Sequence, residues 1–305
     1  MLWRWLRAGA AVVILAALAW RLGTDAFVDG IRAVDLSTVL AALGIGAVTT
    51  VLSAVRWCLV CRALGLPLAF SVAVADYYRA LLLNAVLPAG VLGDVHRAVS
   101  HGQETGESGR AARSVVLERT AGQLVLTVVG AFVLLAHGAS GRLLPDVGVG
   151  LAVVGVLVSA VVVAVRRLPP WSRPRRTLAA TGADVRRVLA GDVAPGVLAL
   201  SVAVLAGHVA LFLVAADAAG VTASAVELVP LLLVALCAMG LPINVGGFGP
   251  REAAAAWAFG LAGLGAAEGL TTAVVYGVLA LLASAPGVVV LLSRLHGRTQ
   301  PAQAG

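Results

Sequence analysis

The chain contains no lysine, because all 22 of its basic residues are arginine. A Walker A loop needs a lysine to reach the β- and γ-phosphates, and a pyridoxal phosphate enzyme needs one for its Schiff base, so both classes are excluded. Charge is scarce as well: charged residues make up 12% of the 305 residues and apolar residues 60%. A soluble domain carries about twice that share of charge. The composition therefore predicts a membrane protein.

Cysteine is also rare. Three cysteines are too few for a disulfide framework, and Cys58 and Cys61 have the spacing of a redox or metal pair without a second pair to accompany them. We therefore expect structural thiols, no metal and no cofactor. The net charge of +7 fits either nucleic acid or an anionic bilayer. The positions of the arginines favour the bilayer, and we expect no nucleic-acid partner.

Long uncharged runs predict an all-α polytopic membrane fold, since a helix that crosses the bilayer needs about 20 apolar residues. Five runs reach or approach this length: residues 36–55, 120–141, 147–165, 193–216 and 269–293. A shorter run at 8–20 lies between Arg7 and Arg21, which can extend to the two interfaces. We expect it to be a sixth span, and the alternative is a cleaved signal peptide.

Two further apolar segments are interrupted and do not fit one straight helix. Residues 66–97 contain Asp76 and Pro88, and residues 228–263 contain Pro242, Pro250 and several glycines. Irregular backbone at membrane depth is tolerated only where protein or a watery cavity receives it. We expect two re-entrant or broken helical elements, and the alternative is two kinked full spans.

The distribution of arginine predicts the orientation, because cytoplasmic loops carry an excess of positive charge. With six spans and two re-entrant elements, 16 arginines lie in inside loops, Arg56 and Arg97 among them. Three lie outside, and Arg79, Arg119 and Arg251 lie in membrane elements. Both termini are then cytoplasmic, and the first broken element enters from the cytoplasm and the second from outside. Arg56, with Trp57, is expected to anchor the end of a span at the interface.

The longest polar stretch, residues 166–192, is also the most basic, with seven arginines. It is compatible with an amphipathic helix on an anionic leaflet or a docking site for a partner. The third interpretation is a cytoplasmic connector whose charge only sets the topology. The stretch is too short for a soluble catalytic domain.

An internal repeat relates the two broken elements at a shift of 154 residues. Pro88 is followed by Gly93 and Arg97, and Pro242 is followed by Gly247 and Arg251 at the same offsets. Interrupted helices in corresponding places of two oppositely oriented halves are typical of transporters with inverted repeats. We therefore expect one membrane domain over 1–305, with a first half (1–145), a span and basic connector (146–192) and a second half (193–305).

Polar groups in these elements are the candidate site, because ionisable side chains in a membrane are costly. Glycine and proline would leave peptide dipoles bare, and Pro250 would start a helix whose N-terminus, beside Arg251, suits a phosphate. Glu118 and Arg119 have an alternative role as the interfacial end of a span. The predicted substrate-binding residues are Asn84, Gly93, Asp94, Arg97, Glu118, Arg119, Asn244, Gly246, Gly247, Gly249, Arg251 and Glu252.

These motifs together resemble a known family. Arg56-Trp57, the stretch from Asn84 to Arg97, Glu118-Arg119 and the run from Pro242 to Glu252 are similar to the lysylphosphatidylglycerol synthase transmembrane domain, also called the flippase-like domain. The resemblance implies a multispan bacterial or archaeal domain that moves phospholipid. We expect a stand-alone member of the family without the C-terminal synthase domain of the full-length enzymes. Leu92 stands where the family usually has the first glycine of Gly-Gly-Asp.

We therefore expect a phospholipid translocase of the cell membrane that moves an anionic or aminoacylated lipid without nucleotide hydrolysis. Arg97 and Arg251 would bind the phosphate, and the acids would balance them or meet a cationic headgroup. The expected partners are the lipid, the bilayer, a separately encoded lipid-modifying enzyme and a second copy of the chain. The alternative is an enzyme or accessory subunit acting on a polyprenyl-linked glycosyl carrier.

Overall fold

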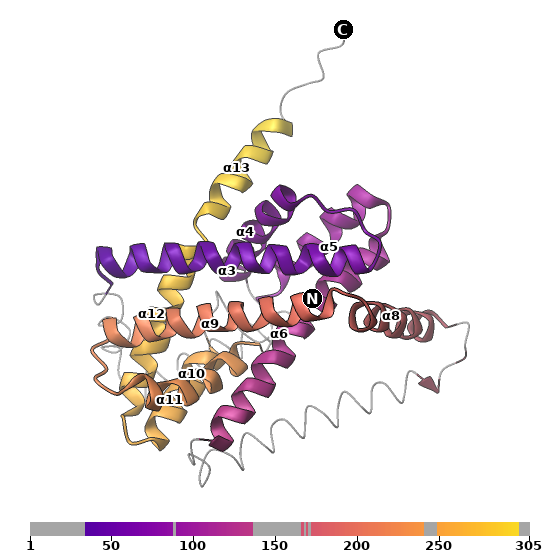
Figure 1. The fold of residues 1–305 in the computed structure, drawn as a ribbon. Coiled ribbons are helices and arrows are strands. Elements are labelled where there is room, and N and C mark those ends of the chain that lie inside the picture. Colours follow the sequence, from indigo (N-terminus) through magenta and orange to yellow (C-terminus); the bar gives the residue numbers. More distant parts are fainter. Residues whose placement is uncertain are drawn as a thin grey trace.

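The computed structural model describes residues 34–87, 90–136, 166–167, 169, 172–240 and 249–298, and this part of the chain is helical without a strand. Figure 1 shows the helices, which pack side by side along much of their length. In chain order they are α3 (Leu36–Ala63), α4 (Phe70–Val86), α5 (Leu92–Thr105), α6 (Ser108–Ala136), α8 (Arg173–Ala190), α9 (Ala194–Ala218), α10 (Ala225–Met239), α11 (Pro250–Leu261), α12 (Ala266–Ala283) and α13 (Pro286–Arg298).

Four helical stretches are long and apolar enough to cross a bilayer: α3, α6, α9 and the continuous pair Ala266–Leu292, formed by α12 and part of α13. They confirm helices at four of the six predicted spans. The other two, 8–20 and 147–165, lie outside the described residues, so the count of six and the orientation stay predictions. α6 begins at Ser108, earlier than its apolar run, so the helix itself carries Glu118 and Arg119.

Both interrupted segments contain a pair of short helices. α4 ends at Val86, Leu87 is extended, and α5 starts at Leu92. α10 and α11 correspond to them, with residues 241–248 between the two outside the described part. With 17 residues in α4 and 15 in α10, each is about 22–26 Å long, which is shorter than a bilayer core of about 30 Å. Whether these elements are re-entrant stays a prediction.

The helices of the first half recur in the same order in the second half: α3, α4, α5 and α6 correspond to α9, α10, α11 and α12. Contacts correspond as well, because α5 packs on α4 and α6 as α11 packs on α10 and α12. Across the halves, α6 contacts α9 and α10, while α12 contacts α3 and its continuation α13 contacts α4. Exchanging the two halves therefore reproduces most of the packing.

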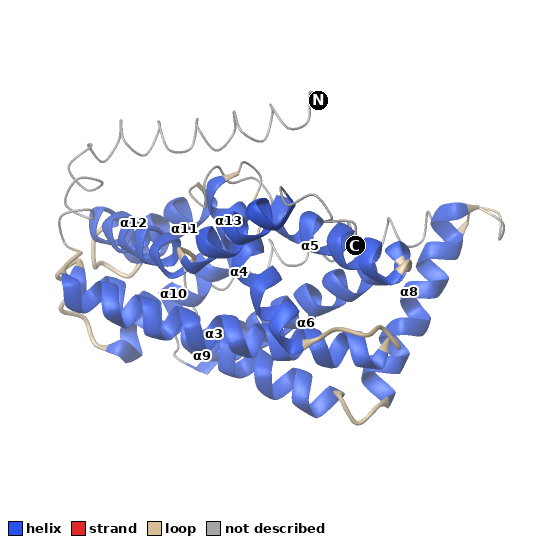
Figure 2. Ribbon diagram, turned by 90° about the horizontal axis from the view of Figure 1, so that it is seen from above, coloured by secondary structure: helices blue, strands red, loops and turns tan. Residues whose placement is uncertain are grey.

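α3 and α9 form the largest contact between the halves, and they run antiparallel. A Cβ on Gly207, late in α9, would meet Thr49, whereas one on Gly196, early in α9, would meet Leu59, further along α3. Small residues let membrane helices approach closely. Figure 2 shows α3 and α9 side by side along their length. The corresponding helices α3 and α9 thus point in opposite directions.

Candidate functional site

Arg97 of α5 is the centre of a buried polar cluster in the first half. Its side chain has 0% exposure, and the central carbon of its guanidinium lies 4.5 Å from the ring centroid of Trp57 and 4.3 Å from that of Tyr77. The two rings are neighbours in an edge-to-face arrangement, with centroids 6.3 Å apart. Two aromatic rings therefore attract the buried cation electrostatically.

Glu118 of α6 connects four helices. Its carboxylate accepts hydrogen bonds from Arg56 Nε of α3 at 2.8 Å, from the Tyr77 hydroxyl of α4 at 2.7 Å and from Arg97 Nη2 of α5 at 3.0 Å. Arg56 also donates through Nη1 to the Ser201 hydroxyl of α9 at 3.1 Å, which ties the cluster to the second half. Glu118 is fully buried, so these charge-assisted bonds act with little screening by water.

A second layer of polar residues borders the cluster at the start of α5. Asp94 pairs with Arg97 at 3.3 Å and with Arg119 at 2.9 Å, and the Arg119 side chain is 42% exposed. Asn84, at the end of α4, donates to Asp94 at 3.1 Å and accepts from the Gly93 backbone N–H at 2.7 Å. Asn84 thus joins the two helices across the break, and Arg119 is the member of this layer that faces outward.

The cluster has a surplus of positive charge and of donors. Arg56, Arg97 and Arg119 face two carboxylates, those of Asp94 and Glu118. Asp76 and Arg79, also buried on α4, pair with each other at 2.6 Å. Arg97 Nε and Nη1 are buried and have no hydrogen-bond partner among the described residues. Buried donors are normally satisfied by protein, water or a ligand, so this set is suited to an anion.

The second half has a smaller polar group at the start of α11. Arg251 and Glu252 are buried neighbours that form an ion pair, and the Glu252 carboxylate also accepts the Gly249 backbone N–H at 2.5 Å. The Arg251 guanidinium lies over the ring of Tyr276 of α12, 5.0 Å from its centroid, and the Tyr276 hydroxyl bonds to His208 of α9 at 3.0 Å.

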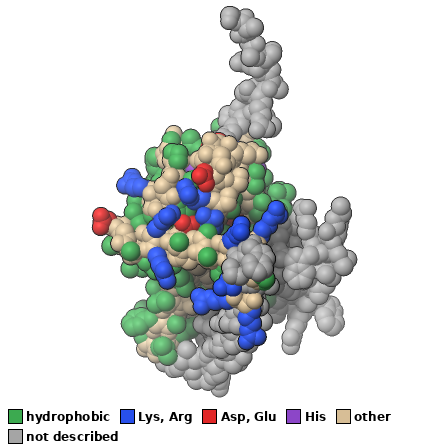
Figure 3. Space-filling model, turned by 90° about the vertical axis from the view of Figure 1, so that its right-hand side faces the viewer, with side chains coloured by type: hydrophobic (Ala, Val, Ile, Leu, Met, Phe, Trp, Pro, Cys, Tyr) green, Lys and Arg blue, Asp and Glu red, His purple; other side chains and the backbone are tan. Residues whose placement is uncertain are grey.

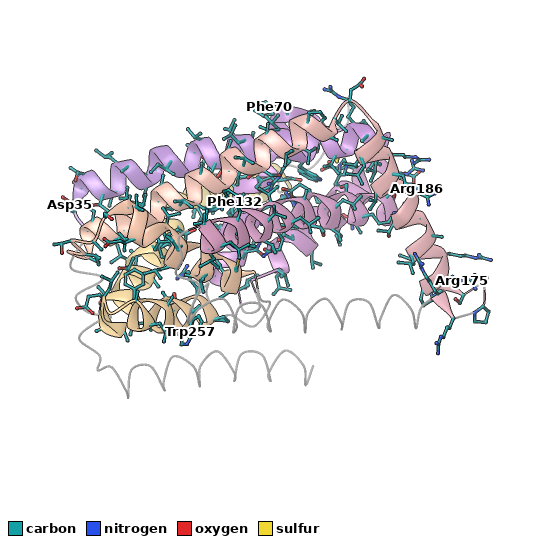
Figure 4. The ribbon with its side chains drawn as sticks, turned by 60° about the horizontal axis from the view of Figure 1, so that its bottom comes forward. Asp35, Phe70, Phe132, Arg175, Arg186 and Trp257 are labelled. Carbon is teal, nitrogen blue, oxygen red and sulfur yellow. The ribbon has the colours of Figure 1, made fainter. Side chains whose placement is uncertain are left out.

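α9 links the two groups. Ser201 and His208 are seven residues, or about 10 Å, apart on one face of this helix; Ser201 contacts Arg56, and His208 contacts Tyr276. Figure 4 shows the side chains that fill the space between the helices from this direction. The polar groups of both halves therefore meet along α9 inside the helical bundle.

The structure brings the predicted first-half residues together: Asn84, Gly93, Asp94, Arg97, Glu118 and Arg119 lie within one network. In the second half, Gly249, Arg251 and Glu252 lie together, whereas Asn244, Gly246 and Gly247 lie outside the described residues.

One expectation is confirmed in part and another needs correction. A glycine can admit either another backbone or a ligand, and Gly93 admits a backbone: it lies within α5, where a Cβ would collide with the Ala80 carbonyl of α4. Arg56 is not an interface anchor and Arg97 is not in a cytoplasmic loop, because both are buried by ion pairs with Glu118. Counting arginines along the sequence cannot distinguish an arginine in a loop from an arginine that forms a buried ion pair near the end of a helix.

The phosphate site expected at the start of α11 is occupied by the protein itself, since Glu252 accepts the Gly249 N–H and neutralises Arg251. An anion would have to displace this carboxylate. Sequence reasoning also missed Tyr77, Ser201, His208 and Tyr276 as members of the polar groups. For Ser201, His208 and Tyr276, isolation in an apolar run was the available signal, because buried hydroxyl and imidazole groups need partners. For Tyr77 the signal was its position between Asp76 and Arg79.

Comparisons with known proteins give the family of the chain. Long apolar helices and buried ionisable residues define an integral membrane protein with a polar interior. The family model for the lysylphosphatidylglycerol synthase TM region matches residues 4–287, and the chain belongs to this family. No curated protein and no solved structure matches the chain. The family indicates a membrane protein involved in lipid handling.

Proposed function

We propose that this protein is a phospholipid translocase that moves an anionic or aminoacylated phospholipid between leaflets, and that it acts as a transporter rather than an enzyme. The observation that carries the proposal is the buried cluster around Arg97, in which three arginines face two carboxylates. A lipid phosphate would supply the missing negative charge and accept the unpaired N–H groups of Arg97.

The layer around Asp94 supports a route for the headgroup. Arg119 is half exposed and paired with Asp94, so a phosphate would meet Arg119 before it met Arg97. When Arg119 turns to the phosphate, Asp94 is released and can pair with an amine on the headgroup. An aminoacylated lipid therefore matches both members of the Asp94–Arg119 pair, whereas a purely anionic lipid matches one.

We also propose that the two halves form an inverted repeat with six spans, two re-entrant elements and cytoplasmic termini. The repeated helix order, the exchanged contacts and the antiparallel α3 and α9 support this arrangement. In such transporters the substrate lies between the halves near the bilayer midplane. The contact of Arg56 with Ser201, which joins the two halves, supports a site between them.

The setting that we propose is the bacterial cell membrane. The lipid would flow down its gradient or be coupled to protons through the buried acids. A separately encoded enzyme would make the aminoacylated lipid, and the chain could act as a homo-oligomer.

Translocation can be measured with the full chain in liposomes that contain fluorescent phosphatidylglycerol in both leaflets. An impermeant reductant destroys the fluorophores of the outer leaflet, so translocation appears as loss of the protected inner signal. We expect the wild-type protein to remove this signal. Arg97→Gln should slow it by about tenfold or more, because a hydrogen bond to a charged group contributes about 1.5–3 kcal/mol.

The matched control is Arg173→Gln, which removes the same charge from an exposed position on α8. It should translocate at the wild-type rate. Arg119→Gln tests the same cluster at its exposed edge, where loss of folding is a smaller risk than at Arg97. Wild-type protein that translocates no faster than the double variant Arg97→Ala, Arg251→Ala would contradict the proposal.

A further inference from the structure

The basic helix α8 has no role in the proposed path, yet it carries five arginines in 18 residues. They are Arg173, Arg175, Arg176, Arg186 and Arg187. Asp184 is the only acid of the helix and its only fully buried residue, and it pairs with Arg113 of α6 at 2.6 Å. The negative charge of α8 is therefore directed into the protein, and its outer surface is uniformly basic.

α8 lies across the ends of the spanning helices. Figure 2 shows it running across the direction of α3 and α9, and in Figure 4 it extends from Arg186 beside the bundle to Arg175 away from it. It contacts α3, α6 and α9, and Val188 packs against the apolar cluster around Trp57. Because α3 and α9 are long enough to cross the bilayer, a helix across their ends lies along the membrane surface.

The arginines of α8 fall on two faces. Helical periodicity places Arg175, Leu178, Gly182, Arg186 and Leu189 on one face, which repeats the pattern Arg-x-x-Leu after 11 residues. The Leu189 side chain is 69% exposed. The other face carries Arg173, Arg176, Ala183 and Arg187 and has no large apolar side chain. Only the first face combines apolar and basic groups.

From this arrangement we propose that the Arg175–Leu189 face of α8 binds the anionic phospholipid headgroups of the adjacent leaflet. Leu178 and Leu189 enter the boundary between headgroups and acyl chains, and the neighbouring arginines bond to lipid phosphates. Arg62 and Arg110 lie at the nearby ends of α3 and α6 and extend the same basic surface. Figure 3 shows arginines gathered on this side of the molecule.

A bilayer explains this face better than a protein partner does. The exposed Leu189 and the partly exposed Leu178, beside arginines, match the layered chemistry of a membrane surface, apolar below and anionic above. The tie between Asp184 and Arg113 holds the helix against α6, so the face is presented in one orientation. The proposal does not rest on lipid translocation, since it concerns binding alone.

The test places a fluorophore on the proposed face. A Cβ at Gly182 would have nothing within 4 Å, so Gly182→Cys leaves room for a label. The full chain, with Cys58, Cys61 and Cys237 replaced by alanine, is reconstituted in vesicles of two parts phosphatidylcholine and one part phosphatidylglycerol. Brominated acyl chains on one lipid or the other quench fluorophores that they touch. We expect brominated phosphatidylglycerol to quench about twofold more than phosphatidylcholine brominated at the same mole fraction.

Two controls make the result specific. A label on the adjacent Ala183→Cys, on the other face, should be quenched less than the label at 182. Arg175→Gln with Arg186→Gln should abolish the preference for phosphatidylglycerol, whereas Arg173→Gln with Arg176→Gln, which removes equal charge, should keep it. A label at 182 that lipid does not quench, or that both lipids quench equally, would overturn the proposal, and in that case a protein partner becomes the better occupant.

Discussion

The two halves place similar chemistry on corresponding helices but organise it differently. In the first half, an acid on α6 forms ion pairs with an arginine on α5 and with a second arginine on α3. In the second half, an arginine on α11 lies over a tyrosine on α12, which bonds to a histidine on α9. The first group shares its charges among three helices, and the second pairs its charges between adjacent residues.

This difference separates stability from function. Arg251 and Glu252 are adjacent residues of α11 and form their ion pair within one helix turn. Glu118 balances arginines from two other helices, so its cluster exists only when α3, α5 and α6 are assembled. Among the described residues, the half with shared charges also holds the arginine with unpaired buried donors, Arg97. This difference is why the anion that we propose is assigned to the first half.

The largest expected effect comes from removing the shared acid. Glu118→Gln leaves Arg56 and Arg97 buried without their carboxylate and should lower the free energy of unfolding by about 3–5 kcal/mol. Glu252→Gln deprives one arginine instead of two and should cost about half as much. Titration with a denaturing detergent measures both. Equal losses would show that the charges of the first half are not shared as we describe.

Close helix packing is the next point of comparison. Gly93→Ala drives a Cβ into the Ala80 carbonyl of α4, and Gly269→Ala drives one into the Ala255 carbonyl of α11. Each should cost about 1–3 kcal/mol, because backbone cannot rotate away. Gly44→Ala has nothing within 4 Å of the new Cβ and should stabilise α3 by up to about 1 kcal/mol. Unchanged stability of Gly93→Ala would contradict the α4–α5 contact.

Two tyrosine hydroxyls test the difference in charge directly. Tyr77→Phe keeps the ring under Arg97 and removes a hydrogen bond to the carboxylate of Glu118, for which we expect a loss of about 1.5–3 kcal/mol. Tyr276→Phe removes a bond to His208 and should cost about 0.5–1.5 kcal/mol. Thermal unfolding of the purified variants ranks them. A larger loss for Tyr276→Phe would contradict the statement that Tyr77, and not Tyr276, bonds to a charged partner.

The smallest effect concerns the starts of α3 and α9. Asp35 caps α3 by accepting the Thr38 N–H at 2.8 Å, whereas Val193 provides no side-chain cap for α9. Hydrogen bonds from Thr38, followed by that from Ser37, lower the pKa of Asp35 below its ordinary value. The stabilisation is therefore complete above the unfolded pKa and is lost as the pH falls through the folded pKa.

Asp35→Asn keeps a capping side chain that does not titrate. The variant should show a weaker loss of stability than the wild type when the pH is lowered below about 4. Unfolding measured across this range compares the two proteins. Identical pH profiles would mean that the Asp35 cap contributes nothing that depends on charge.

Composition, hydropathy and motif spacing were sufficient for the membrane class, for four spanning helices and for six residues of the first cluster. These features can be predicted because each depends on residues that are close together in the sequence, such as a run of apolar residues or a proline followed by glycine. Arginine counting failed at Arg56 and Arg97, because both are buried residues of helices. Their burial depends on an acid elsewhere in the chain.

The sequence by itself determined that the chain is an apolar, helical, arginine-rich membrane protein. Long uncharged runs are stable only in a bilayer or a protein interior, and their length matches that of a helix that crosses the bilayer. The tertiary structure alone decided which charges meet. Arg56 is 62 residues from Glu118 and 145 from Ser201, and no local pattern encodes a partner at that distance. Only the packing of α3, α5, α6 and α9 creates a buried arginine with donors still free for a ligand.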